Sequence, residues 1–174
     1  MTSVSTIRMG FLESDDRLLL DFVYPDETMT LLITRRITRR MIQGLAQMLA
    51  NSNAAMARVP ASHKTEMLIW EHLSARQLGE GCDAGPAAEQ PPRKKMPWPL
   101  LQKLDVTAQK GGFCLSFQGS DGVLVTLDTN RGELHRLLAS LRQLARHAEW
   151  GLDTAVGWLV EADSPTMRPG SLAS

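Results

Sequence analysis

Aromatic residues and cysteines are scarce in this chain of 174 residues, and long apolar runs are missing. The two cysteines, Cys82 and Cys114, do not form a CxxC motif, which argues against a disulfide framework and fits a reducing compartment. No apolar run approaches the roughly 20 residues that span a bilayer, and the N-terminus lacks the charged start and apolar stretch of a secretory signal. We therefore expect a cytoplasmic protein that has no membrane partner.

An excess of charge of either sign is also missing. Lysine and arginine number 19, and aspartate and glutamate number 19, so no overall field draws the protein to nucleic acid or to a membrane surface. Any basic binding site must therefore be local. The length suits one compact domain, or two small and closely joined ones, and it is sufficient to bury a core.

Signatures of common catalytic and cofactor sites do not occur in the sequence. It has no P-loop, no GxGxxG fingerprint and no HExxH motif, so we expect no catalytic, cofactor-binding or metal-binding residue. Ser120 lies between glycines, but the flanking strand patterns predict a hairpin turn rather than the strand-to-helix elbow of a hydrolase nucleophile. The histidines lack i,i+4 spacing, and we expect exposed or helix-surface positions for all four: His63, His72, His135 and His147.

The strongest helical pattern spans residues 34–49, with Thr34 as the predicted N-cap. Its apolar stripe consists of Ile37, Met41, Ile42, Leu45, Met48 and Leu49. The opposite side carries four arginines, which are Arg35, Arg36, Arg39 and Arg40. Positive charge in the first two turns opposes the helix macrodipole, so acidic side chains or an anionic partner should compensate it.

Alternating apolar residues predict three strands before this helix, and the last third of the chain repeats the arrangement. The strand residues of the first unit are Ile7, Met9 and Phe11, then Leu18, Leu20 and Phe22, then Met29, Leu31 and Ile33. Those of the second unit are Leu104, Val106 and Ala108, then Phe113, Leu115 and Phe117, then Val123, Val125 and Leu127. Thr129 or Asn130 is expected to cap the second helix, with Glu133 completing a capping box.

Corresponding positions in the two stretches are offset by about 94 to 97 residues, which indicates an internal pseudo-repeat. We predict an α+β protein of two pseudo-repeated βββα units, with an antiparallel sheet or sheets and helices packed on one side. The expected divisions are a first unit (1–53), a connecting helix and linker (54–100), a second unit with a C-terminal extension (101–160) and a flexible tail (161–174). Together they are expected to form one compact domain.

The arginine cluster has two interpretations. Guanidinium groups and first-turn N–H groups suit phosphate oxygens, which favours an anionic partner. Alternatively, the turn after the first strand lies at the same end of the sheet as the helix start, and its acidic residues would neutralise the arginines. Those residues are Glu13, Asp15 and Asp16. In the second unit the signs are reversed, with Lys110 in the turn and Asp128 and Glu133 at the helix start, which favours local charge matching.

The linker between the units is rich in proline and glycine over residues 79–99. Trp98 stands between two prolines and follows a short basic run, Arg93, Lys94 and Lys95. A basic, aromatic segment of this kind is typical of a docking peptide or of a single-strand binding surface. Alternatively, Trp98 anchors the linker on the core. Trp70 and Trp150 lie on or beside helical stripes and are predicted to pack.

These observations favour a non-enzymatic intracellular interaction or accessory protein that binds a protein partner or associates with itself, as in a dimer. The alternative is a single-stranded nucleic-acid binder that uses the arginine-rich helix start and the basic-aromatic linker. A second alternative is an enzyme whose site is assembled only in three dimensions. The candidate partner-binding residues are Arg35, Arg36, Arg39, Arg40, Arg93, Lys94, Lys95 and Trp98.

Overall fold

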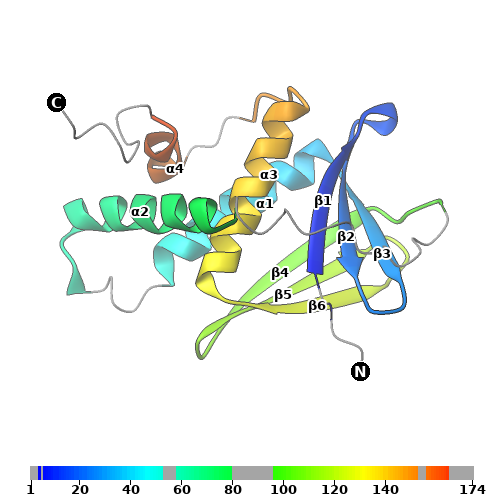
Figure 1. The fold of residues 1–174 in the computed structure, drawn as a ribbon, viewed down its shortest axis with the longest axis horizontal. Coiled ribbons are helices and arrows are strands. Elements are labelled where there is room, and N and C mark those ends of the chain that lie inside the picture. The colour runs from blue at the N-terminus through cyan, green and yellow to red at the C-terminus, as the bar shows by residue number, and fades with distance from the viewer. Residues whose placement is uncertain (1–3, 5, 53–57, 80–95, 153–155, 165–174) are drawn as a thin grey trace.

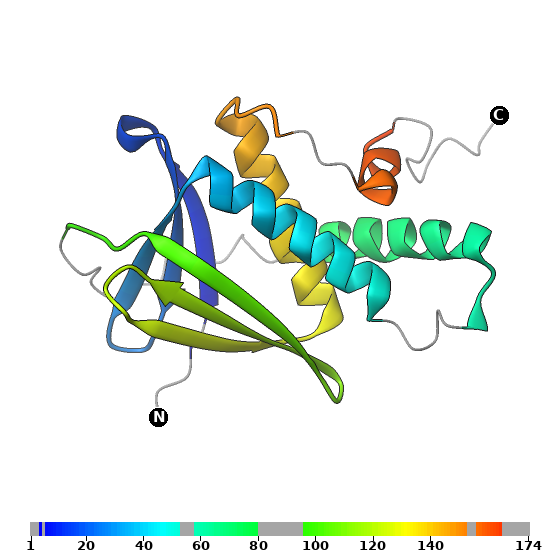
Figure 2. The same cartoon turned by 180° about the vertical axis from the view of Figure 1, so that it is seen from behind.

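A computed structural model of the chain describes residues 4, 6–52, 58–79, 96–152 and 156–164 (Figures 1 and 2). The first unit contains β1 (Thr6–Leu12), a short 3-10 helix η1 (Glu13–Asp15), β2 (Arg17–Val23), β3 (Thr28–Ile33) and α1 (Arg35–Asn51). After α2 (Ala61–Gly79), the second unit contains β4 (Leu101–Gln109), β5 (Gly112–Gly119), β6 (Leu124–Thr129) and α3 (Arg131–His147). Two antiparallel sheets, β1-β2-β3 and β4-β5-β6, pack with the helices. The predicted α+β class with two βββα units is confirmed.

The two repeat helices begin where their sequences supply an N-cap. The Thr34 hydroxyl accepts a hydrogen bond from the Ile37 N–H at 3.3 Å. The Asn130 side chain accepts one from the Glu133 N–H at 2.9 Å, and the Glu133 carboxylate accepts one from the Asn130 N–H at 2.9 Å. This capping box identifies Asn130 as the cap of α3. The caps Thr34 and Asn130 are 96 residues apart, and each helix is 17 residues long. Positions in α1 and α3 therefore correspond at an offset of 96 residues.

Strand pairing extends this correspondence into the sheets. Met29 and Val125 each lie five residues before their caps, and they pair with Phe22 of β2 and Phe117 of β5. Phe22 therefore corresponds to Phe117, and the ring centroids of these two residues lie 5.0 Å apart. Because corresponding residues touch each other, a pseudo-two-fold axis passes near this pair. Both rings are fully buried within a core to which both sheets and all four helices contribute. One core therefore joins the two units.

The repeat helices are exchanged between the units. α1 packs against β4, α3 packs against β1, and the two helices pack against each other. Figures 1 and 2 show α1 and α3 crossing beside the sheets, with α2 on the far side of α3. Each repeat helix therefore lies over the edge strand of the other unit, and the two helix–strand contacts can be compared directly.

The connecting helix predicted between the units is α2, which packs on α3 and on α4 (Gly157–Ala162). α2 turns Leu68, Ile69 and His72 towards its neighbours, and all three are buried. Trp70 points the other way and is 58% exposed, so the prediction that it packs is wrong. Trp150 is buried, as predicted. The tryptophan content alone did not indicate which face of α2 the neighbouring helices would cover.

The C-terminal extension of the second unit contains the short helix α4. Trp158 and Leu159 are buried against α2 and α3, while Val160 is exposed. Most of the predicted flexible tail, residues 165–174, lies outside the described residues. Among the helices that the structure describes, none is both long and apolar enough to cross a membrane.

Candidate interaction site

The arginine face of α1 consists of Arg35, Arg36, Arg39 and Arg40, and all four residues are exposed. Together with Gln43 they line a shallow, open hollow on the helix. With respect to the described residues, none of the four forms an ion pair or a side-chain hydrogen bond. Arg35 and Arg39 are one turn apart, as are Arg36 and Arg40, so like charges lie next to each other.

The predicted charge matching between this face and the first turn is wrong. Asp16 instead accepts a hydrogen bond of 2.6 Å from the indole N–H of Trp150, and Asp15 accepts one from Ser14. The reason is the helix exchange, which brings the end of α3 against the first unit. There Phe11 packs edge-on against His147 and Trp150, with centroids 6.0 and 6.2 Å apart. The other unit thus supplies the partner of the acidic turn.

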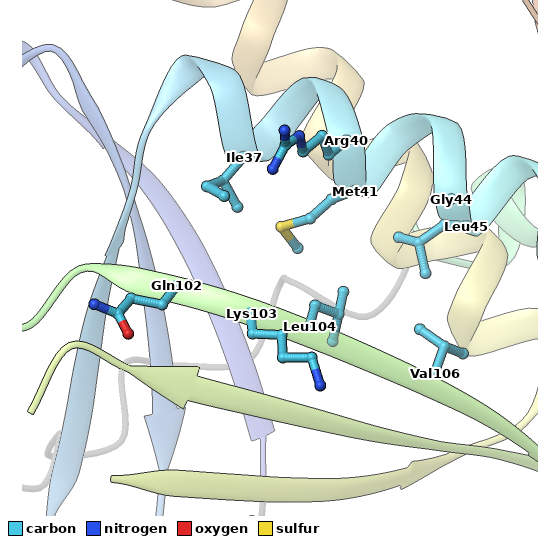
Figure 3. A pocket seen from close by; sticks show the side chains of 9 residues that line it. All are labelled: Ile37, Arg40, Met41, Gly44, Leu45, Gln102, Lys103, Leu104 and Val106. Carbon is cyan, nitrogen blue, oxygen red and sulfur yellow. The ribbon is translucent and has the colours of Figure 1, made fainter. Parts of the chain in front are cut away.

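An apolar groove of about 210 Å³ lies between α1 and β4, beside the arginine face (Figure 3). Its lining comes from both elements: Ile37, Arg40, Met41, Gly44, Leu45, Gln102, Lys103, Leu104 and Val106. In Figure 3 Ile37, Met41 and Leu45 point from the helix towards the strand. We call this the α1–β4 groove. Because Lys103 pairs with Asp105 at 2.7 Å, its charge is already matched and the unmatched positive charge at the groove comes from α1.

Gly44 contributes to the opening of the groove. A Cβ atom added to Gly44 would meet no atom within 4 Å, so close packing does not require glycine there. Glycine inside a helix destabilises it by roughly 1 kcal/mol relative to alanine. On the helical wheel, Arg36 and Arg40 flank the same side of α1 as Gly44, whereas Arg35 and Arg39 lie farther round. The groove therefore has an apolar floor and a basic rim.

A second polar cluster lies between α2, α3 and α4, with His72 and His135 buried and Glu71 and Arg131 partly buried; we call these four residues the buried network. Arg131 donates two hydrogen bonds to Glu71, at 2.8 and 3.0 Å. It also donates to the Ser52 hydroxyl at 3.1 Å and to the Leu49 carbonyl at 2.8 Å, and so satisfies the end of α1. Positive charge at a helix C-terminus is favoured by the macrodipole.

The histidines of the buried network touch each other. His72 Nδ1 and His135 Nδ1 are 3.3 Å apart, and His135 Nε2 lies 3.4 Å from Glu71. Burial, together with the positive charges of His135, Arg142 and Arg76, lowers the pKa of His72 to about 3. Burial alone would raise the pKa of Glu71, but hydrogen bonds and charge from His135 and Arg131 outweigh it and lower that pKa to about 2. His72 is therefore uncharged at neutral pH.

The expectation of exposed histidines is confirmed for His63 and His147 and is wrong for the other two. His72 and His135 are each 1% exposed, and Trp158 of α4 packs edge-on against both rings. The pair is 63 residues apart in sequence, so no local spacing indicated it. The only sequence signal was the placement of Arg131 and His135 one turn apart on the predicted helix.

Of the four candidate partner-binding residues in the linker, one is among the described residues. Arg93, Lys94 and Lys95 lie outside them. Trp98 is described and is half-buried, and the carbonyl of the next residue, Pro99, accepts a hydrogen bond of 2.9 Å from Leu32. The end of the linker is thus attached to β3 of the first unit.

Two further chemistries can be assessed on the described residues. No group of three or more His, Cys, Asp or Glu among them is arranged to hold a metal ion. Burial, followed by the neighbouring carboxylate of Asp128, raises the pKa of the Cys114 thiol, which disfavours the reactive thiolate. Comparison of the chain with protein-family models, curated proteins and solved structures found no match.

Proposed function

We propose that this is a non-enzymatic interaction protein that binds an acidic segment of a partner protein through the arginine face of α1 and the adjoining α1–β4 groove. The observation that carries the proposal is the group of four exposed arginines on two successive turns. No described carboxylate pairs with any of them.

This arrangement destabilises the isolated helix. Each like-charged pair one turn apart costs about 0.2–0.5 kcal/mol, and positive charge in the first turn opposes the macrodipole by about 0.3–1 kcal/mol per residue. A partner that supplies carboxylates would remove both penalties on binding. Arginine forks suit this role because each can hold a carboxylate through two parallel hydrogen bonds.

The groove favours a protein segment over a single-stranded nucleic acid. Nucleic-acid strands bind on aromatic side chains that stack with bases, and none of the described residues lining the groove or the arginine hollow is aromatic. The net charge of zero gives no general attraction for a polyanion. Aliphatic side chains of a partner, by contrast, find Ile37, Met41 and Leu104 in the groove.

Fluorescence anisotropy across a salt series tests the proposal. The probes are a labelled peptide that alternates glutamate and leucine, the same peptide with lysine for glutamate, and a single-stranded DNA of equal length. The test variant carries Arg36→Gln and Arg40→Gln. The matched control carries Arg8→Gln and Arg76→Gln, which remove the same charge from exposed positions on β1 and α2.

Salt-sensitive binding of the acidic peptide, weakened about tenfold or more in the test variant and kept in the control, is the expected result. Tighter binding of the DNA, with the same loss in the test variant, would instead make the arginine face a nucleic-acid site. Equal binding of the glutamate and lysine peptides, or no binding by the unmodified protein at low salt, would contradict the proposal.

A second candidate, self-association, is favoured by an apolar stripe on α2. Met67, Trp70 and Leu78 are 37%, 58% and 70% exposed, and helical spacing places them on one side of α2. Light scattering across a concentration series checks this, with Trp70→Glu as the variant. A dimer that dissociates in the variant is expected. A monomer at all concentrations would contradict self-association and leave the arginine-face proposal untouched.

A further inference from the structure

We infer that the partner segment binds as an added β-strand along the outer edge of β4, with carboxylates near Arg36 and Arg40 and apolar side chains towards Gly44. This inference rests on the proposed function and specifies the conformation and the side-chain order of the segment.

β4 is the outermost strand of its sheet and pairs with β5 on one side. Among the described residues, its other side is met by strand pairing only just before the strand begins, through a single bridge between Leu32 and Leu100. Beyond Leu101 no described strand pairs with the outer edge of β4. Unpaired strand edges of this kind are templates for strand addition.

The helix–strand contact between β1 and α3 corresponds to the contact between β4 and α1. Strand pairing makes Ala108 of β4 the counterpart of Phe11 of β1, because Phe11 pairs with Leu18 and Ala108 pairs with Phe113. Phe11 fills the contact between β1 and α3 by packing against His147 and Trp150. Ala108 is exposed. The chain therefore packs its own aromatic side chain into one helix–strand contact and has a small, exposed residue at the corresponding strand position of the other.

Charged and apolar side chains follow a definite order along the α1–β4 groove. Figure 3 shows α1 and β4 running side by side, with Arg40 nearer the Gln102 end than Gly44, and Leu45 above Val106. An added strand would place alternate side chains beneath the outer flank of α1. Those near the start of β4 would meet the rim formed by Arg36 and Arg40, whereas those farther along would meet the apolar side of α1 at Gly44. A segment with carboxylates at one end and aliphatic side chains at the other complements this order.

The test uses labelled peptides with threonine at every second position and, in between, glutamates in one half and valines in the other. Both orders are synthesised, since an added strand can run in either direction, and the tighter binder becomes the probe. Two N-methylated forms of the probe lack alternate backbone N–H donors, one form for each set of donors. The protein variants are Gly44→Trp, which fills the groove, and Gly44→Ala, its matched control.

Strand addition predicts that only one of the two N-methylated forms loses affinity, by about tenfold or more, because only one set of donors faces β4. It also predicts a similar loss for Gly44→Trp and none for Gly44→Ala. Equal loss with both N-methylated forms would indicate a helical segment, and no loss with either would indicate side-chain contacts alone. Either result overturns the inference.

The proposed function is read out separately in the same experiment. If Arg36→Gln with Arg40→Gln weakens the probe while Gly44→Trp and both N-methylated forms do not, the acidic partner remains and strand addition fails. If the arginine variant has no effect, the proposed function itself fails.

Discussion

The starts of α1 and α3 occupy corresponding positions in the pseudo-repeat, yet one is exposed and the other is covered. Arg35 and Arg39 of α1 correspond to Arg131 and His135 of α3. Arg131 and His135 contact Glu71, which α2 brings against α3. Arg35 and Arg39 have no such carboxylate among the described residues. The same pattern of basic residues thus stabilises the fold in one half and is available to a partner in the other.

The end of each opposing helix explains why Arg35 does not reproduce the contacts of Arg131. Arg131 donates to the Leu49 carbonyl and the Ser52 hydroxyl of α1. The counterpart of Leu49 is Ala145, and its carbonyl accepts a hydrogen bond of 3.0 Å from the backbone N–H of Trp150. The counterpart of Ser52 is Ala148, which has no hydroxyl. The hydroxyl acceptor is therefore missing, the carbonyl acceptor already holds one hydrogen bond, and no described carboxylate takes the place of Glu71, so the Arg35 side chain is exposed.

Replacing Arg131 and replacing its counterpart Arg35 should change the free energy of unfolding very differently, and this is the largest difference that we expect between the halves. Arg131→Met leaves Glu71 without its main partner and removes two bonds to the end of α1, so we expect a loss of about 2–3 kcal/mol in the free energy of unfolding. Arg35→Met should instead raise it by about 0.5–1.5 kcal/mol, since it removes one like-charged pair and one positive charge in the first turn of α1. Urea denaturation of both variants measures this. Equal losses would contradict the comparison.

The covered half should also be sensitive to pH. The pKa of His72 is about 3 in the folded protein against 6.5 ordinarily, so the unfolded chain takes up a proton first as pH falls below 6.5. Stability from the uncharged His72 is therefore present in full above 6.5 and is lost between pH 6.5 and about 3. Between pH 7 and pH 5 we expect a loss of about 2 kcal/mol from this residue.

Urea denaturation at the two pH values checks this loss, with His72→Leu as the test variant and His63→Gln as the control on the same helix. A reduced dependence on pH is expected only for His72→Leu. Glu71, with a pKa of about 2 against 4.5, adds its own loss only as pH falls below 4.5, so it does not enter this interval. An unchanged pH dependence in His72→Leu would contradict the role assigned to burial.

The smallest change in stability is expected for a substitution at Gly44, in the α1–β4 groove. Gly44→Ala should raise the free energy of unfolding by about 0.5–1 kcal/mol, because alanine favours the helix and the added Cβ meets open space. The same change at Gly112 should destabilise the protein, since its Cβ would lie 2.4 Å from the Thr129 carbonyl oxygen. Thermal unfolding compares the two. A destabilised Gly44→Ala variant would show that the groove is already filled.

Local signals in the sequence predicted the elements well. Thr34 and Asn130 cap their helices as their side chains suggested, and alternation identified the strands through residues such as Phe22 and Phe117. The arrangement between units could not be read in this way. The exchange of helices depends on packing between segments far apart in sequence. Because of it, the Asp16 carboxylate accepts a hydrogen bond from the Trp150 indole and does not pair with an arginine of α1.

Only the part of the candidate site that lies within one helix could be predicted from the sequence. Helical spacing placed Arg35, Arg36, Arg39 and Arg40 on one exposed face, because that depends only on their own helix. The groove beside them required β4, which follows α1 by about 50 residues along the chain. The pairing of His72 with His135 likewise required contact between two helices, and no periodic pattern encodes it.

The most direct measurement is a map of backbone amide chemical shifts in the isotope-labelled protein on addition of the acidic glutamate–leucine peptide. We expect the salt-sensitive shift changes to concentrate on the first turns of α1 and on β4, and Arg36→Gln with Arg40→Gln to abolish them. The start of α3 should stay unperturbed, because its basic residues already have Glu71. Chemical-shift changes centred on α2 or α3, or no changes at all, would contradict the claim that the partner binds at the arginine face of α1 and the α1–β4 groove.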